Sequence, residues 1–478
     1  MLSSYHGGRF LSKGFRLVLE PFFQAPGLPF ADVLSEGEVE AAFAVEGVCL
    51  RESPRAVFTP AVTLWAWLSQ VVHAGELSSC AAAVARVAVL MLTLGRTPCS
   101  TDTAAYCRAR AKLPEVVLRR LVLEVGNGLE ARLPADWLWH GRHVKLADGT
   151  TVMMADTSDN QTAYPQQRSQ ARGLGFPRAR LVVLLSLATA AVCGMAMAPC
   201  LGKETGETAL LREMLDLLDA GDILVADRFF CTYFLLALAL ERGVDAVVRQ
   251  HACRKTDFRR GRMLARREHV VSWEKPQRPA WMDAESYASI PDTLSVREIE
   301  VDVEVPGFRV TRIVVVTTLL DQRQYAKEDL AGLYRERWHV ELDLRSIKAS
   351  LDMDQLRTKT PAMVHRDIWV HLLAYNLIRK VAAQAALREG KFPRQIGFAG
   401  TRQMIAASWS ELSRASPQTV QTMASQQFPL IAQHEVGNRP NRVEPRAVKR
   451  RPKPHRLLQK PRRQAREELL RRRPPRRC

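Results

Sequence analysis

The sequence of 478 residues predicts an α/β protein with a mixed sheet that carries helices on both faces. Between residues 143 and 250, β-type runs and helical patterns follow in the order strand, strand, strand, helix, strand, helix, strand, which is typical of a mixed sheet. Hydrophobic residues make up 47% and charged residues 25% of the chain, which excludes collagen-like, mostly disordered and polytopic membrane proteins. The length is enough for about two to four domains.

Residues 1–137 are expected to form a mainly helical N-terminal region. Residues 79–94 are rich in Ala, Val and Leu, residues 95–98 break this pattern, and residues 100–102 offer N-caps for a second, basic helix. Two helices with a short break are typical of a helix-turn-helix that binds DNA, and also of an ordinary helical hairpin. The spacing alone leaves both alternatives open.

The first part of the α/β domain is expected at residues 138–250. Two β-type runs, 144–147 and 151–154, flank an Asp-Gly-Thr sequence that reads as a hairpin-like turn. A later apolar run ends directly before Asp227. We therefore expect Asp148 and Asp227 at strand ends, where a sheet holds a short side chain rigidly.

One stretch, residues 181–201, has 21 residues without a charge and is long enough to cross a bilayer. It is diluted by polar residues, Gly, Pro and five Ala, and it begins with a β-type run. Two buried strands joined by a tight turn are the better interpretation, so no membrane partner is expected. The nine cysteines form no Cys-x-x-Cys pair and no signal peptide is recognisable, which fits the cytoplasm.

Residues 251–325 are expected to form a β-rich insertion. Its approach is basic, because residues 249–269 carry eight Arg or Lys against two acidic residues. Apolar residues then alternate up to Val305, and a Pro-Gly turn at 306–307 leads to another β-type run, which predicts a hairpin.

Two long helical patterns follow the insertion. The segment 326–390 is expected to be the second part of the α/β domain, with helices at 327–350 and 364–388. A C-terminal helical segment is expected at 391–436.

The basic character of the chain is concentrated in its tail. Residues 437–478 contain 17 Arg or Lys, three Glu and seven Pro, and contribute +14 of the formal charge of +19. A segment with so few large apolar side chains cannot offset its ordering entropy, so it is expected to be disordered. Its natural partner is a polyanion, which suggests association with DNA in the nucleoid.

The helix expected at 327–350 carries four chemically distinctive residues. At about 100° per residue, Arg337, Glu341 and Lys348 fall near −60°, −20° and −40° from Tyr334, so all four share one face. Trp338 falls near +40° on the same helix and could stack on a base or belong to the core. An isolated charged helix with i, i+4 ion pairs is the simple alternative.

Two acidic residues of this helix, Glu336 and Asp343, are expected to point the opposite way. Glu341 is therefore the carboxylate that shares a surface with the aromatic and the two cations. Together with Asp148 and Asp227 it supplies three hard oxygen donors, which is what two Mg²⁺ or Mn²⁺ ions about 4 Å apart require. The three together indicate a metal-dependent phosphodiester site.

Three motifs resemble those of DDE transposases of the insertion-sequence-4 family: Asp148-Gly149-Thr150, Ala226-Asp227-Arg228, and Tyr334-x-x-Arg337-x-x-x-Glu341-x-x-x-x-x-x-Lys348. The resemblance covers roughly residues 140–385. It implies a ribonuclease-H-like catalytic fold with a β-rich insertion between the second Asp and the Glu.

By this resemblance, Asp148, Asp227 and Glu341 are the catalytic metal ligands for two Mg²⁺ ions, with Mn²⁺ as a substitute. The DNA-binding residues are expected to be Tyr334, Arg337 and Lys348, which handle terminal phosphates and a flipped base, together with Trp338. Arg can fork onto a phosphate, Lys supplies a point charge, and Tyr or Trp can stack.

The expected function is cut-and-paste DNA transposition, in which a strand is cut at the ends of the element and joined to target DNA. Double-stranded DNA is the expected partner, and the pairing of two ends implies a homodimer in the synaptic complex. One alternative is an inactive or domesticated DNA-binding protein that keeps the fold. Another is a recombinase with Tyr334 as a covalent nucleophile, which would leave both Asp residues unexplained.

Overall fold

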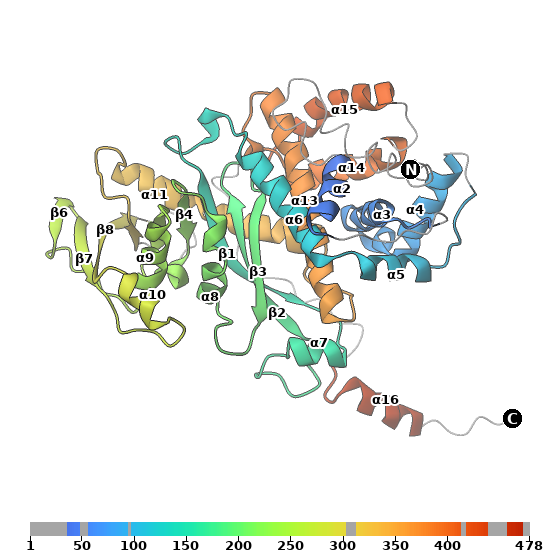
Figure 1. The fold of residues 1–478 in the computed structure, drawn as a ribbon, viewed down its shortest axis with the longest axis horizontal. Coiled ribbons are helices and arrows are strands. Elements are labelled where there is room, and N and C mark those ends of the chain that lie inside the picture. The colour runs from blue at the N-terminus through green and yellow to red at the C-terminus, as the bar shows by residue number, and fades with distance from the viewer. Residues whose placement is uncertain are drawn as a thin grey trace.

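The structure is a computed structural model that describes residues 36–47, 56–93, 97–302, 312–412, 417–437 and 457–471 (Figure 1). The part before the sheet is helical, as expected. Its helices are α2 (Glu36–Val45), α3 (Pro60–Val72), α4 (Cys80–Thr93), α5 (Ala104–Lys112) and α6 (Glu115–Glu130).

The connection between α4 and α5 is longer than the short break that the sequence suggested. Helix α4 ends at Thr93 and α5 begins at Ala104, whereas a helix-turn-helix has a turn of about three or four residues. One of the basic residues of α5, Arg110, is also buried, with 8% of its surface exposed. These two features favour the ordinary helical arrangement.

The centre of the protein is a single mixed sheet with the strand order β3-β2-β1-β4-β5-β9-β8-β7-β6. Strand β1 pairs antiparallel with β2 and parallel with β4, as in a ribonuclease-H-like sheet. The strands of the first half are β1 (Val144–Met153), β2 (Arg178–Ser186), β3 (Val192–Pro199), β4 (Ile223–Ala226) and β5 (Asp245–Arg249).

The expected hairpin turn at 148–150 is wrong. Strand β1 runs without interruption through the Asp-Gly-Thr sequence, and Asp148 lies opposite Val183 of β2. Continuous backbone pairing with β2 keeps this segment extended although its residues favour turns. The apolar stretch 181–201 does form two antiparallel strands, β2 and β3.

Helices cover both faces of the sheet. Leu146, Val183 and Val225 point to the face covered by α6 and α13 (Pro361–Arg388), whereas Ala147 and Leu224 point to the opposite face. That second face is covered by α8 (Glu207–Arg212) and α9 (Tyr233–Glu241). The alternation follows from the period of two of a strand.

The β-rich insertion continues the central sheet instead of forming a sheet of its own. Strand β9 (Arg312–Thr317) pairs antiparallel with β5, and β8 (Thr293–Asp302) pairs with β9. Strands β7 (Glu268–Glu274) and β6 (Arg262–Ala265) complete the edge. The turn expected at 306–307 lies outside the described residues.

The long helix expected at 327–350 is broken into three pieces. They are α11 (Lys327–Glu336), α12 (Trp338–Arg345) and a π-helical turn at Ser346–Ser350. The helices α14 (Phe398–Leu412) and α15 (Pro417–Ala432) follow α13.

The tail departs from the expected disorder in one segment, because Arg462–Arg471 forms helix α16. One ion pair between Arg463 and Glu467, four residues apart, supports that helix. The tail segments 438–456 and 472–478 lie outside the described residues. Within the described parts of the chain, no helix is long and apolar enough to span a membrane.

Candidate active site

Asp148 and Asp227 lie side by side on neighbouring parallel strands. The register pairs Ala147 of β1 with Ala226 of β4, so the residue that follows each Ala lies at the same level of the sheet. Asp227 comes directly after β4, as expected, whereas Asp148 lies within β1. Its side chain is 19% exposed.

Glu341 approaches the two Asp residues from helix α12. Arg337, at the junction of α11 and α12, connects it to β1: Nη2 donates to Glu341 Oε1 at 3.1 Å and Nη1 lies 3.5 Å from Asp148 Oδ2. The guanidinium group therefore lies between two carboxylates that were expected to bind metal. Arg337 and Glu341, which the helical spacing placed on one face, thus lie next to β1.

The pKa of Asp148 reflects the burial and the crowding of acidic groups at the site. Burial raises the pKa of Asp148 to about 6, the neighbouring charges of Glu341 and Asp227 act in the same direction, and Arg337 acts against them. Three carboxylates repel one another at this site, and the single guanidinium group of Arg337 balances only part of their negative charge. Such perturbed groups at a cleft are typical of a functional site.

The donor set suits a divalent metal ion, because three carboxylates on rigid elements are the hard oxygen ligands that Mg²⁺ and Mn²⁺ prefer. Within the described residues, no three Asp, Glu, His or Cys side chains are already arranged around one point as ligands. The position of Arg337 gives a physical reason, because its guanidinium group occupies the space between Asp148 and Glu341.

The two aromatic residues, Tyr334 and Trp338, differ in how far their side chains are exposed to solvent. Tyr334 is 7% exposed and Trp338 is 46% exposed. The Tyr334 ring lies 6.0 Å from the guanidinium carbon of Arg337, and burial raises the pKa of its hydroxyl. Trp338 is therefore more accessible to a DNA base than Tyr334 in this conformation.

Lys348 lies in the π-helical turn and pairs with Asp354 at 3.0 Å. A π-helical turn inserts an extra residue into the helical repeat and often marks a functional site. The side chain of Lys348 is 25% exposed. Each of the two signature cations, Arg337 and Lys348, thus has an acidic partner within the protein.

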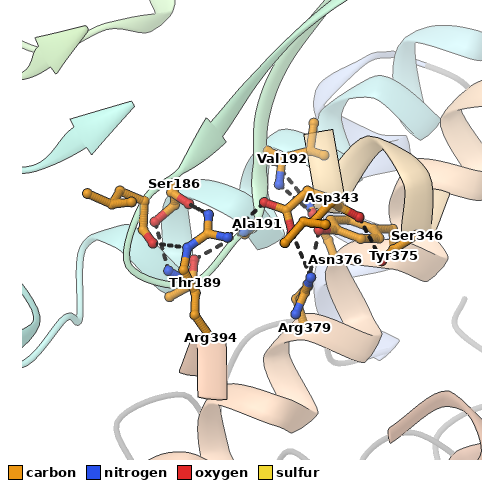
Figure 2. A network of polar contacts seen from close by, with 12 residues as sticks. Ser186, Thr189, Ala191, Val192, Asp343, Ser346, Tyr375, Asn376, Arg379 and Arg394 are labelled. Atoms are coloured by element: carbon orange, nitrogen blue, oxygen red, sulfur yellow. Dashed lines mark hydrogen bonds and ion pairs between the residues drawn. The ribbon is translucent and has the colours of Figure 1, made fainter. Parts of the chain in front are cut away.

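The sequence predicted that Asp343 points away from Glu341 and left its surroundings open. It does point away from Glu341, but into the protein, where it is 1% exposed and accepts hydrogen bonds from Arg379 at 2.7 Å and Arg394 at 2.9 Å (Figure 2). Arg394 also donates to the backbone oxygen of Ser186. Asp343 thus connects α12 to α13 and to the end of β2.

Sequence reasoning missed Glu207, the first residue of α8. A Cβ atom on Gly149 would lie 2.4 Å from the carboxyl carbon of Glu207, so the Glu207 side chain occupies the space that a side chain at position 149 would need. Burial raises the pKa of Glu207, and the charge of Asp227 acts in the same direction. The available signal was a glycine inside a strand, which often marks a close approach.

Strands β1 and β4 and helix α12 thus define a ribonuclease-H-like protein with an acidic site at the centre of its sheet. The family model for the transposase DDE domain matches residues 139–377, half of the chain. The chain therefore belongs to the DDE-domain transposase family, and its function is DNA transposition.

The chain is similar to several transposases of insertion sequences. It is 23% identical over 358 residues to the transposase InsG of the element IS4 from Escherichia coli K12, covering 73% of this chain and 77% of that protein. It is 38% identical over 65 residues to the transposase of IS421 from Escherichia coli, covering 14% and 18%. A piggyBac transposase in a synaptic complex with hairpin DNA has a TM-score of 0.42 and 10% identity, covering 88% and 85%.

Proposed function

We propose that the protein cuts DNA strands at the ends of a mobile element and joins the freed 3′ ends to target DNA at a site formed by Asp148, Asp227 and Glu341. The observation that carries the proposal is the meeting of these three carboxylates, from β1, β4 and α12, around the guanidinium group of Arg337. Carboxylates crowded in this way without a structural purpose would cost stability.

The three carboxylates would hold two Mg²⁺ ions, with Mn²⁺ as a substitute, and these ions would supply water activation and stabilisation of the leaving 3′ oxygen. The protein's own contribution is to bind and orient DNA. Arg337, once released from Asp148 and Glu341, is within reach of a phosphate that lies at the same place. Lys348 can likewise leave its present partner, Asp354, and bind a second phosphate of the DNA. Trp338 offers an accessible ring for stacking on a base, with Tyr334 behind it.

Two ends must be cut in concert, so we propose a homodimer in the synaptic complex. The DNA substrate places the active protein in the cytoplasm, at the nucleoid. The insertion and the basic tail would add phosphate contacts that depend on salt but not on sequence.

The direct test is incubation of the protein with the element's own end sequences and Mg²⁺, followed by mapping of the 3′ ends. We expect nicks at the element boundary, dependent on Mg²⁺ or Mn²⁺, and joined products when target DNA is added. A protein that binds the ends but leaves them uncut at any metal concentration would contradict the proposal. A covalent adduct through Tyr334 would identify a recombinase instead.

A further inference from the structure

A cleft of about 1060 Å³ opens beside the acidic site and extends to the N-terminal helices. Asp148 and Glu341 line one end of it, and residues of α3 and α5, among them Arg110, line the other. The N-terminal region therefore forms a wall of the same cavity that contains two of the three carboxylates. Figure 1 shows this wall at the opposite end of the molecule from the insertion strands β6 to β8.

The rim of the cleft carries two free cations. Arg345 and Arg357 both line the cleft and are exposed, and in the described part of the chain neither has an ion-pair or hydrogen-bond partner. The other charged groups are largely matched, since Lys348 pairs with Asp354. Two exposed carboxylates, Asp352 and Asp354, also lie on the rim, and of these Asp352 has no ion-pair partner in the described part of the chain. The unmatched positive charge of the two arginines suits a chain of phosphates.

The interior end of the cleft contains a polar group in need of a partner. Arg110 is 8% exposed, its guanidinium carbon lies 3.9 Å from the centroid of the Trp67 ring, and Nη1 donates to Cys80 Sγ at 3.3 Å. Its Nη2 lies 3.8 Å from Asp367 Oδ1, a carboxylate that also lines the cleft, and only its Nε has no hydrogen-bond partner within the described structure. An unmatched buried donor is costly and indicates an acceptor that arrives with a ligand.

The size of the cleft restricts the ligand. Its volume is at the upper limit of the range of about 300–1,000 Å³ for small-molecule sites, which is enough for a few nucleotides but too small to enclose a duplex. Its lining mixes apolar side chains with amides and hydroxyls, which suits bases as well as phosphates.

We propose that this cleft binds a short single-stranded stretch of DNA that continues from the scissile phosphate on the side away from the insertion. Arg345 and Arg357 hold its phosphates, and Arg110 is the donor at the inner end. This inference rests on the proposed function, because it takes the scissile phosphate to lie at Asp148 and Glu341. The N-terminal helices then take part in positioning the substrate strand at the active site.

The test measures binding without cleavage, in EDTA, with fluorescein-labelled hexathymidylate as the probe. Arg345→Ala and Arg357→Ala should each raise the Kd for this probe about fivefold or more, as loss of a charged phosphate contact implies. Arg119→Ala is the matched control, because Arg119 is exposed on α6 and does not line the cleft. It should bind as the wild type does. Equal affinities for all four proteins would overturn the proposal.

A second measurement locates the probe. Cys80 is partly exposed and lines the cleft, whereas Cys253 is exposed in the insertion. Peptide-resolved alkylation should show that hexathymidylate slows the modification of Cys80 and leaves Cys253 unaffected. Protection of Cys253 alone, no protection at either residue, or equal protection of Cys80 by a random 20-base-pair duplex would each overturn the proposal. Because no metal is present, these outcomes are independent of whether the protein cuts DNA.

Discussion

The guanidinium group of Arg337 lies 3.5 Å from the carboxylate of Asp148, so a cation of the protein itself neutralises part of the acidic site. The same group donates to Glu341. In the absence of DNA and metal, this arrangement reduces the repulsion between the carboxylates. Arg337 is therefore positioned to exchange one anionic partner, a carboxylate, for another, a phosphate.

Asp148→Asn, Asp227→Asn and Glu341→Gln should each lower the rate of strand cleavage by at least about a thousandfold, because each removes a charged metal ligand. Binding to the ends should change little, since phosphate contacts are kept. Cleavage and gel-shift assays on the same preparations measure both. Asp159→Asn is the control, as Asp159 is an exposed residue of α7 (Ser158–Ala163). Cleavage at a near wild-type rate by any of the three variants would remove that residue from the site.

The pKa of Asp148, raised to about 6 from 3.8, predicts how stability depends on pH without metal. Between these two values the folded state binds a proton that the unfolded state has lost, so stability falls as the pH rises through this window. Asp148→Asn should therefore be more stable than the wild type at pH 7, by up to about 3 kcal/mol, and the gain should shrink below pH 5. Thermal unfolding in EDTA at several pH values measures this. A gain that stays constant with pH would contradict the assignment.

Asp343→Ala should destabilise the protein by about 3–5 kcal/mol, because it leaves Arg379 and Arg394 buried without their carboxylate. Urea unfolding measures the loss. Asp216→Ala is the matched control, since Asp216 pairs with Arg242 but is 82% exposed. The control should cost no more than about 1 kcal/mol. Similar losses in both variants would mean that the buried network contributes little.

Gly149→Ala should destabilise the protein by no more than about 1 kcal/mol, because the new methyl group forces the carboxyl group of Glu207, the end of a flexible side chain, to move. Most of this loss should disappear in the Gly149→Ala, Glu207→Ala double variant, because the space is then free. A double-mutant cycle in urea gives the coupling energy between the two positions. Additive effects would show that the two residues do not compete for the same space.

Removal of residues 437–478 should weaken non-specific DNA binding and reduce its salt dependence. Each engaged phosphate contributes about −0.9 to the slope of log K against log salt, so the loss of a segment with 17 Arg or Lys should flatten the slope by several units. Titrations on random duplex at several salt concentrations measure it. Equal slopes for both proteins would mean that the tail does not touch DNA.

The sequence predicted the alternation of strands and helices well, because the spacing of apolar residues along the chain follows the side chains that each strand or helix buries. It misjudged the segment around Asp148, where local turn propensity was outweighed by pairing with β2. The three carboxylates could be selected because their spacing matches a known motif.

Other features of the site depend on contacts between segments far apart in the chain. The break at Arg337 and the π-helical turn cannot be read from a regular 100° repeat. The burial of Asp343 depends on two arginines that lie 36 and 51 residues away in the sequence. The approach of Glu207 to Gly149 likewise exists only once α8 has packed on the sheet.

The continuity of the insertion with the central sheet has a mechanical consequence. Strand β9 is hydrogen-bonded to β5, and β5 to β4, whose end carries Asp227. A continuous ladder of backbone hydrogen bonds joins these strands, so a load applied at β6 or β7 would be transmitted across the sheet without a flexible joint. If duplex binds at the outer strands, as proposed above for the insertion, it would be held at a fixed offset from Asp227, and its bending would strain the DNA rather than the protein.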